Sequence, residues 1–211
     1  MKTDSLIALL AQDAPVKYNL SHMLHQSTIA AVLIVAIAFF STIGLRSDID
    51  TAMHTGRFLF KFVITISLAV ASSLVMYRIG RPGVPFRWWA WSLSVPLALI
   101  VGAAVFEISV MPPETWAAQM IGHNSRLCLT IIPSLSLGPL ACFLLTLRHG
   151  APSRPELAGG VAGLASAGIA ATFYAANCDD DSPLFVLLWY PIAISVVVGI
   201  GALAGRKLLQ W

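Results

Sequence analysis

Long apolar stretches alternate with short polar connections along most of the chain. Six stretches are apolar over enough length to cross a membrane, at about residues 27–45, 58–77, 89–110, 127–147, 157–176 and 184–204. A membrane helix needs roughly 20 mostly apolar residues, and each stretch is close to that length. The pattern therefore predicts an all-α fold, a polytopic membrane bundle of six transmembrane helices.

The polar residues outside these stretches leave little room for another domain. We expect an N-terminal segment (1–26), a transmembrane domain (27–204) and a short C-terminal tail (205–211). The first apolar run follows a long polar stretch with few basic residues, which is a poor match to a cleavable signal peptide. We therefore expect the first helix to be retained.

The composition supports a membrane protein and excludes some other classes. The chain is 57% hydrophobic and 11% charged, whereas soluble domains carry about 25% charged residues. Its formal net charge of +3 is small. Because no basic arm or basic stripe with interleaved aromatic residues is present, direct nucleic-acid binding has no support.

The distribution of charge predicts the orientation. Most lysines and arginines of the connections fall on one side of a six-helix bundle: Lys2, Lys17, Arg78, Arg81, Arg87, Arg148, Arg154, Arg206 and Lys207. The other side has fewer basic residues and several acidic ones: Arg46, Arg57, Arg126, Lys61, Asp48, Asp50, Glu114 and Asp179 to Asp181. Since cytoplasmic loops are enriched in Lys and Arg, we expect both termini in the cytoplasm.

Local signals also mark helix ends and helix contacts. Asn124 or Ser125 could cap the fourth helix, and Ser182 precedes a proline at the start of the sixth. Two GxxxG pairs, at 159 and 163 and at 201 and 205, allow close helix approach. We expect these pairs to serve packing within the bundle rather than contact between two copies.

The three cysteines differ in depth. Cys128 lies in the first turn of the fourth helix on the outer face, and Cys178 lies in the outer connection between helices five and six. Cys142 is roughly 21 Å deeper along the fourth helix, so we expect a core residue there. Cys128 and Cys178 are thus the pair that topology allows to meet. A redox- or metal-responsive pair, a permanent disulfide and two unrelated thiols all remain open.

The sequence neighbours of the two outer cysteines suggest different roles. Cys128 is near a helix N-terminus with Arg126 and His123 close by, which favours a thiolate, whereas three aspartates follow Cys178. We predict Cys128 as the more reactive thiol and Cys178 as its resolving partner. Cys128, Cys178 and His123 are also weak candidates for a soft metal, since CxxC and His-x₃-His spacings are absent.

Glu107 is the one acidic residue inside an apolar stretch. It lies about one turn from the outer end of the third helix. A carboxylate at that depth needs a partner or water. We expect a local structural pair, for instance with Arg126, and the alternative is a role in proton relay.

The N-terminal segment predicts a short amphipathic helix. Its apolar face is formed by Leu6, Ile7, Leu9 and Leu10, and a turn containing Asp13 and Pro15 follows. Such a helix can lie on the bilayer surface. It can also be a peptide that another protein holds in a groove. The residue pattern alone leaves both interpretations open.

Several longer motifs occur together in one order. They are Leu-Ile-x-x-Leu-x-x-Asp-x-Pro-Val at 6–16, Arg-x-Cys-Leu at 126–129 with Ile-Pro at 132–133, Arg-x-Gly-Ala-Pro-Ser-Arg-Pro at 148–155, Tyr-x-x-x-Cys-x-Asp-Asp-Ser-Pro-Leu-Phe at 174–185 with Trp-Tyr at 189–190, and Gly-Arg-x-Leu-Leu-x-Trp at 205–211. Together they resemble the NrsF family of negative regulators of sigma-F. The resemblance spans nearly the whole chain.

The resemblance implies a function and its residues. It implies a bacterial inner-membrane anti-sigma factor that holds an extracytoplasmic-function sigma factor at the membrane until heavy metal or oxidants release it. Cys128 and Cys178 match the family's paired cysteines. The segment expected to hold the sigma factor is matched by Leu6, Leu9, Leu10, Asp13, Pro15 and Val16.

Other functional classes fit the sequence less well. A membrane thiol-disulfide oxidoreductase generally needs a closely spaced cysteine pair, which this chain lacks. A small transporter predicts polar residues near the bilayer midplane, where this chain has almost no charge. Walker, HExxH and nucleophile-elbow motifs are absent. We therefore expect no enzyme and no cofactor, and the oligomeric state stays open.

Overall fold

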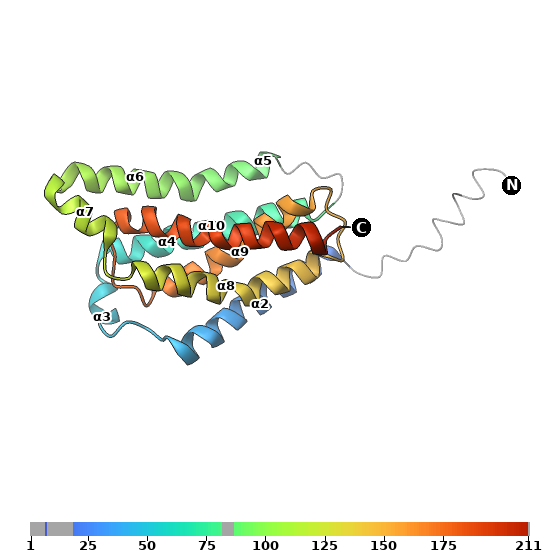
Figure 1. Cartoon of the computed structure of the whole chain (residues 1–211), viewed down its shortest axis with the longest axis horizontal. Helices are drawn as coiled ribbons and strands as arrows, with labels where there is room; N and C mark the ends of the chain where they lie inside the picture. Colours follow the sequence, from blue (N-terminus) through green and yellow to red (C-terminus); the bar gives the residue numbers. More distant parts are fainter. Residues whose placement is uncertain (1–6, 8–18, 82–86, 211) are drawn as a thin grey trace.

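The computed structural model describes Ile7, residues 19–81 and residues 87–210. Within these residues, six helical segments are long and apolar enough to cross a membrane. They run roughly parallel and antiparallel to one another in an elongated bundle (Figure 1). The predicted all-α polytopic bundle is confirmed.

The helices match the predicted stretches, with longer ends in places. The spans other than the third are α2 (Leu20–Thr42), α4 (Gly56–Ile79), α8 (Ser125–Leu147), α9 (Pro155–Ala175) and α10 (Pro183–Leu208). The third span joins α5 (Arg87–Ala90), a 3₁₀ turn η1 (Trp91–Leu93) and α6 (Ser94–Val110). Short helices α3 (Ile49–Ala52) and α7 (Pro113–Ile121) lie in the connections.

Helix α2 begins earlier than the apolar stretch at about residues 27–45 predicted. The helix begins at Leu20, before the apolar run, because the Asn19 side chain accepts a hydrogen bond from the Ser21 backbone N–H at 3.1 Å. The polar first turns are further supported by a contact between His22 and Gln26 at 3.2 Å, one helical turn apart. Helical hydrogen bonds are internal, so a helix can continue past the apolar part of its sequence.

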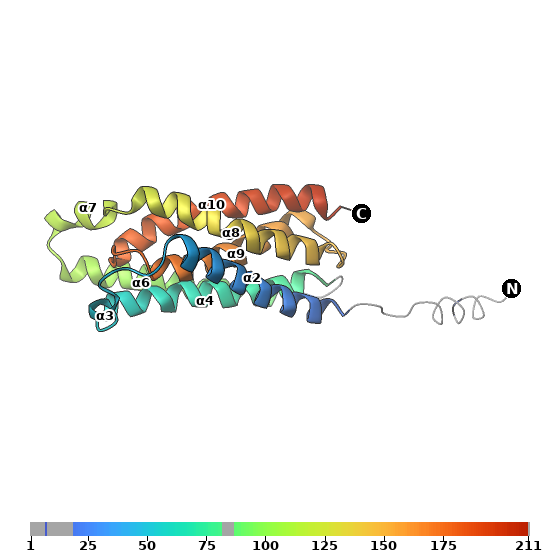
Figure 2. The same ribbon diagram turned by 90° about the horizontal axis from the view of Figure 1, so that it is seen from below.

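Helix α9 is the centre of the bundle, in contact with α2, α4, α8 and α10 (Figure 2). In its membrane span 72% of residues are buried, against 22% to 44% in the other spans. Its buried residues are mostly alanine and glycine, which let neighbouring backbones come close.

The two GxxxG pairs pack against each other. A Cβ atom at Gly163 would lie 2.7 Å from the Val197 carbonyl oxygen, and one at Gly205 would lie 2.5 Å from that of Pro155. Gly159 and Gly201 meet backbone to backbone. The expectation that these glycines serve packing within the bundle is confirmed.

The bundle has two ends of different character. The start of α2 and the end of α10 lie at the same end, here called the terminal end (Figure 1). The opposite end, here called the loop end, holds the connections 43–55, 111–124 and 176–182. The outer cysteines lie at the loop end.

Candidate functional site

The connection between α9 and α10, residues 176–182, is the centre of a polar network at the loop end. Asp181 is held by two cations from different parts of the chain. The Lys61 Nζ atom lies 2.6 Å from Asp181 Oδ1, and the Arg46 Nη1 atom lies 2.9 Å from Asp181 Oδ2. Lys61 comes from α4 and is 2% exposed, so this charge is almost fully enclosed by protein. A buried lysine requires such a partner.

Lys61 and Arg46 also bind the backbone of the connection. Lys61 Nζ donates to the carbonyl oxygens of Cys178 at 2.8 Å and Asp180 at 3.3 Å. The backbone N–H of Arg46 donates to the Ala176 carbonyl at 3.2 Å. The backbone around Cys178 is thus fixed by α4 on one side and by the segment after α2 on the other.

Arg46 connects this network to the start of α3. Its side chain donates to Asp48 Oδ1 at 2.6 Å and Oδ2 at 2.7 Å, in addition to Asp181. The bond to Asp48 is the main cause that raises the pKa of Arg46, and the same bond lowers the pKa of Asp48. The double pairing keeps Arg46 charged and in place.

Asp180 fixes the turn between α7 and α8. Its Oδ2 atom accepts the backbone N–H groups of His123 at 2.9 Å and Asn124 at 2.7 Å. Gly122 turns the chain there with φ +57, and a Cβ atom would lie 2.5 Å from Phe185. Asn124 occupies the N-cap position of α8 as expected, but its side chain donates to Asp179 and makes no capping hydrogen bond. The carboxylate of Asp180 instead holds the two N–H groups of the turn that precedes α8.

The two outer cysteines lie directly beneath this network. Cys128 is 0% exposed and Cys178 is 1% exposed, and both belong to the same core cluster. They are near enough to interact electrostatically, and both are free thiols. The structure therefore places the two cysteines that the sequence selected in one buried cluster. Cys142 lies further along α8 and is only half-buried, outside the core cluster, so the expectation of a core residue there is wrong.

Two tyrosines enclose the thiols. The rings of Tyr174 and Tyr190 have centroids 6.1 Å apart, and the Tyr174 hydroxyl donates to the Asn124 carbonyl at 3.4 Å. The Tyr190 hydroxyl is buried without a hydrogen-bond partner among the described residues. Both tyrosines belong to the same core cluster as the two buried thiols.

The electrostatic reasons given for the two thiols need correction. Burial, rather than the aspartates, is the main cause that raises the pKa of Cys178, and Lys61 opposes it. The His123 side chain is 94% exposed with its ring 3.7 Å from Asp180, and Arg126 is exposed. Neither His123 nor Arg126 therefore supports an exposed, activated thiolate at Cys128. The order of reactivity of the two cysteines stays a prediction.

Glu107 forms the local pair we expected, but with a different partner. Its Oε1 atom lies 3.0 Å from Arg57 Nη2, so the suggested pairing with Arg126 is wrong. Its Oε2 atom accepts from the Ser182 hydroxyl at 2.8 Å. Glu107 faces α4 and the start of α10 because α6 packs on those two helices, whereas Arg126 begins α8.

Ser182 links this pair to the thiol connection. Its hydroxyl also accepts the Leu184 backbone N–H at 3.2 Å, which confirms the predicted cap of α10. The cap is therefore part of a chain of contacts from Arg57 through Glu107 to residues 176–182. Polar groups tie this connection to α4 and α6, to the segment after α2 and to the turn before α8.

Lys61, Arg46 and Asp181 carry the network, although the local sequence pattern predicts no such role for them. A usable signal existed for Lys61, a single lysine within an apolar stretch, since a buried membrane charge needs a partner. The local pattern gave no signal for Arg46, because its partner Asp181 lies 135 residues away in the sequence. Its other partner, Asp48, lies two residues away.

The remaining predicted site residues do not lie in this network. Within residues 19–81 and 87–210, together with Ile7, no group of three His, Cys, Asp or Glu side chains is placed to hold a metal ion. The predicted sigma-binding residues lie outside the described residues: Leu6, Leu9, Leu10, Asp13, Pro15 and Val16.

Comparison with known proteins gives a consistent result. The chain matches the family described as "Negative regulator of sigma F", NrsF, over residues 10–211. It is 33% identical over 220 residues to the anti-sigma-F factor NrsF of Caulobacter vibrioides, and the match covers 100% of both chains. It is 27% identical over 216 residues to a probable anti-sigma-F factor NrsF of Azospira oryzae, again over 100% of both. No solved structure matches the chain.

Proposed function

The chain belongs to the NrsF family, and on that premise we propose that it is an integral inner-membrane anti-sigma factor. In this proposal residues 6–16 hold an extracytoplasmic-function sigma factor in the cytoplasm, and heavy-metal or oxidative stress releases it through Cys128 and Cys178. The observation that carries the proposal is the full-length match to anti-sigma-F factors. The protein then acts by binding, without catalysis.

The charges at the two ends support a cytoplasmic terminal end. The arginines and lysines of the terminal end include Arg78, Arg81, Arg148, Arg154, Arg206 and Lys207. At the loop end, Arg46, Lys61 and Arg57 are all in ion pairs with carboxylates. Since the positive-inside rule concerns Lys and Arg near the helix ends, the terminal end fits the cytoplasm and the thiols then face the periplasm.

The polar network supports a way for the thiols to signal. Residues 176–182 are tied to α4, α6 and the segments beside α2 and α8 by the contacts of Asp180, Asp181 and Ser182. A disulfide, or a metal held by both sulfurs, would change the spacing beneath these contacts. The helices whose ends are fixed there extend to the terminal end, and α2 is joined directly to the N-terminal segment.

The free energy needed to shift the bundle from one helix arrangement to another is modest. A ligand or bond that favours one of two helix arrangements by about 5.5 kcal/mol moves the population from 1:99 to 99:1. Only the difference in free energy of the disulfide, or of the bound metal, between the two helix arrangements counts toward this shift.

Co-purification with sigma factors tests the binding function. Membranes containing the full chain are solubilised and each candidate sigma factor from the same genome is tested for retention. We expect one sigma factor to be retained, and to be lost from variants Leu9→Asp and Leu10→Asp. Gln12→Ala, on the polar side of the predicted amphipathic helix, is the matched control. Retention of no sigma factor would refute the proposal.

Serine substitutions test the role of the thiols. Cys128→Ser and Cys178→Ser should each retain the sigma factor after treatment with peroxide or cadmium, whereas the wild type should release it. Cys142→Ser is the control, because this cysteine lies on the same helix as Cys128 and outside the enclosed pair. Release from both serine variants at the wild-type level would exclude the cysteine pair as the sensor.

A further inference from the structure

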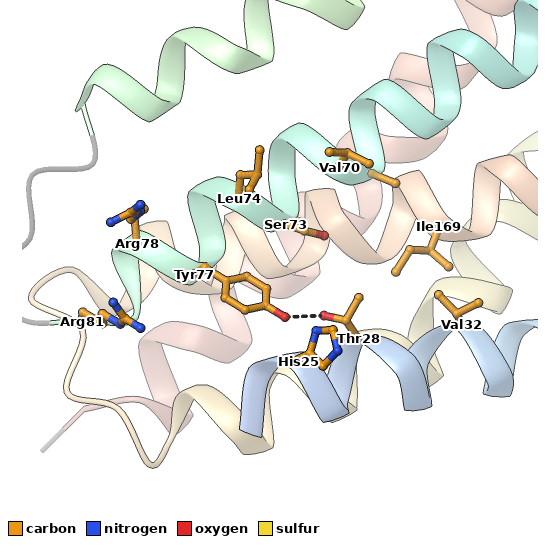
Figure 3. A pocket seen from close by; sticks show the side chains of 11 residues that line it. His25, Thr28, Val32, Val70, Ser73, Leu74, Tyr77, Arg78, Arg81 and Ile169 are labelled. Carbon is orange, nitrogen blue, oxygen red and sulfur yellow. Dashed lines mark hydrogen bonds between the residues drawn. The ribbon is translucent and has the colours of Figure 1, made fainter. Parts of the chain in front are cut away.

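A second site lies at the terminal end, far from the thiols. A cleft of about 730 Å³ opens between α2 and α4, with Ile169 of α9 at its floor (Figure 3). The two helices both pack on α9, and the polar contacts between them include one from Arg81 to Ser21 and one between Tyr77 and Thr28 at 3.4 Å. The cleft therefore has a fixed floor and two separated walls.

The walls of the cleft have an apolar part and a basic part. The apolar part is formed by Val32, Val70, Leu74 and Ile169, and Val70 is 54% exposed. Toward the end of α4 the lining changes to His25, Tyr77, Arg78 and Arg81. Figure 3 shows the two arginines at one end of the cleft and the aliphatic side chains at the other. The lining is amphipathic along the helix axis.

The basic part lacks an anionic partner. Among the described residues, no ion pair includes Arg78 or Arg81. The Arg78 guanidinium lies 4.4 Å from the centre of the Trp89 ring, and the Arg81 side chain donates to Ser21. At the loop end, by contrast, each of Arg46, Arg57 and Lys61 faces a carboxylate. The positive charge at this cleft is left for a ligand.

We propose that this cleft binds an anionic phospholipid. One acyl chain lies between α2 and α4 against Val70 and Ile169, and the phosphate lies at Arg78 and Arg81. Arginine suits this role because its planar guanidinium binds phosphate oxygens in pairs. Basic pockets between transmembrane helices are known to bind anionic lipid headgroups. A free phosphate ion would use the arginines and leave the apolar part empty, so the combined lining favours a lipid.

Lipid titration of the purified full chain tests the charged part of the site. Native mass spectrometry would count bound lipid as phosphatidylglycerol or phosphatidylethanolamine is added to the detergent-solubilised protein. We expect phosphatidylglycerol to bind more tightly. In Arg78→Gln/Arg81→Gln its affinity should fall by roughly tenfold or more, because each basic group near an anionic surface contributes several-fold. Lys207→Gln is the control, since Lys207 is exposed at the same end and lies outside the cleft.

A second variant tests the apolar part. Val70→Trp fills the cleft and keeps both arginines, so it should lower phosphatidylglycerol binding by a similar factor. Inorganic phosphate should compete weakly at most. Unchanged phosphatidylglycerol affinity in either variant, equal affinity for the two lipids in the wild type, or strong competition by phosphate would overturn the proposal. The measurement uses no sigma factor, so its failure would leave the anti-sigma proposal untouched.

Discussion

The two ends of the bundle differ in how their cationic side chains are paired. At the loop end, Lys61 and Arg46 are enclosed and paired with Asp181. At the terminal end, Arg78 and Arg81 line an open cleft without a carboxylate partner among the described residues. The same six helices thus hold a buried, paired lysine at one end and two arginines without a carboxylate partner at the other.

The difference suggests a division of roles along the helix axis. Buried ion pairs resist movement, because separating them leaves a charge without water or partner. The loop end is therefore suited to keep two thiols in a fixed relation until a chemical change occurs. At the terminal end, a cleft opens between α2 and α4, and among the described residues no ion pair includes its arginines Arg78 and Arg81.

The largest expected loss of stability comes from replacing Lys61. Lys61→Met would leave the inner side of Asp181 without its cation and remove two bonds to the backbone of residues 176–182. Removing one partner from a buried pair costs about 3–5 kcal/mol. Thermal unfolding in detergent, followed by circular dichroism, should show a clearly lower midpoint. Lys207→Met should leave the midpoint nearly unchanged, and equal midpoints for all three proteins would show that the network carries no stability.

Gly122 offers the next test of the loop end. Gly122→Ala places a side chain on a residue with φ +57 and ψ −168, against Phe185 and Asp180. We expect a decrease in stability of about 1–3 kcal/mol from the backbone conformation alone, and more from the clash. Gly44→Ala is the matched control, because Gly44 has φ +76 but nothing lies within 4 Å of its Cβ position. The two unfolding midpoints should differ, and equal midpoints would indicate that the turn adjusts freely.

Substitutions of Arg57 and Arg126 test which of the two arginines pairs with Glu107. Arg57→Gln should destabilise the protein by about 1–2 kcal/mol, since it leaves a buried carboxylate without its cation, while about half of the Arg57 side chain is already exposed. Arg126→Gln should have almost no effect. The reverse order in chemical or thermal unfolding would restore the pairing first expected from the sequence.

A smaller effect is expected from pH. The pKa of Cys178 is raised above its ordinary value of 9.0, chiefly by burial. The native protein then keeps this proton at a pH where the unfolded chain loses it, so stability is complete below pH 9.0 and falls as the pH rises above it. Unfolding midpoints measured from about pH 7 to about pH 10 should decline less in Cys178→Ser. Parallel declines in both proteins would contradict a buried Cys178 thiol.

The smallest change in the free energy of unfolding is expected for an ion pair at the terminal end. Arg206 and Glu156 form an ion pair at 3.4 Å, and both side chains are more than half exposed. Because solvent screens such pairs, Arg206→Gln should change the unfolding free energy by about 0.5 kcal/mol or less. A decrease as large as that of Lys61→Met would remove the contrast between the two ends.

The overall fold followed directly from the sequence because membrane helices depend on a local property. A run of apolar residues long enough to cross the bilayer must satisfy its own backbone hydrogen bonds, and a helix does so within one segment. The positions of all six spans, the close packing of the glycine pairs and the cap at Ser182 could thus be predicted. Errors occurred where polar residues extended a helix, as at Leu20.

The site was predicted in part. Sequence alone selected Cys128 and Cys178, because helix count and depth decide which cysteines can meet, and it identified Glu107 as needing a partner. Only the tertiary structure decided that Arg57 supplies that partner, that Lys61 and Arg46 share Asp181, and that the thiols are enclosed. The physical reason is distance along the chain: a span is set by neighbouring residues, whereas an ion pair is set by which helix faces meet.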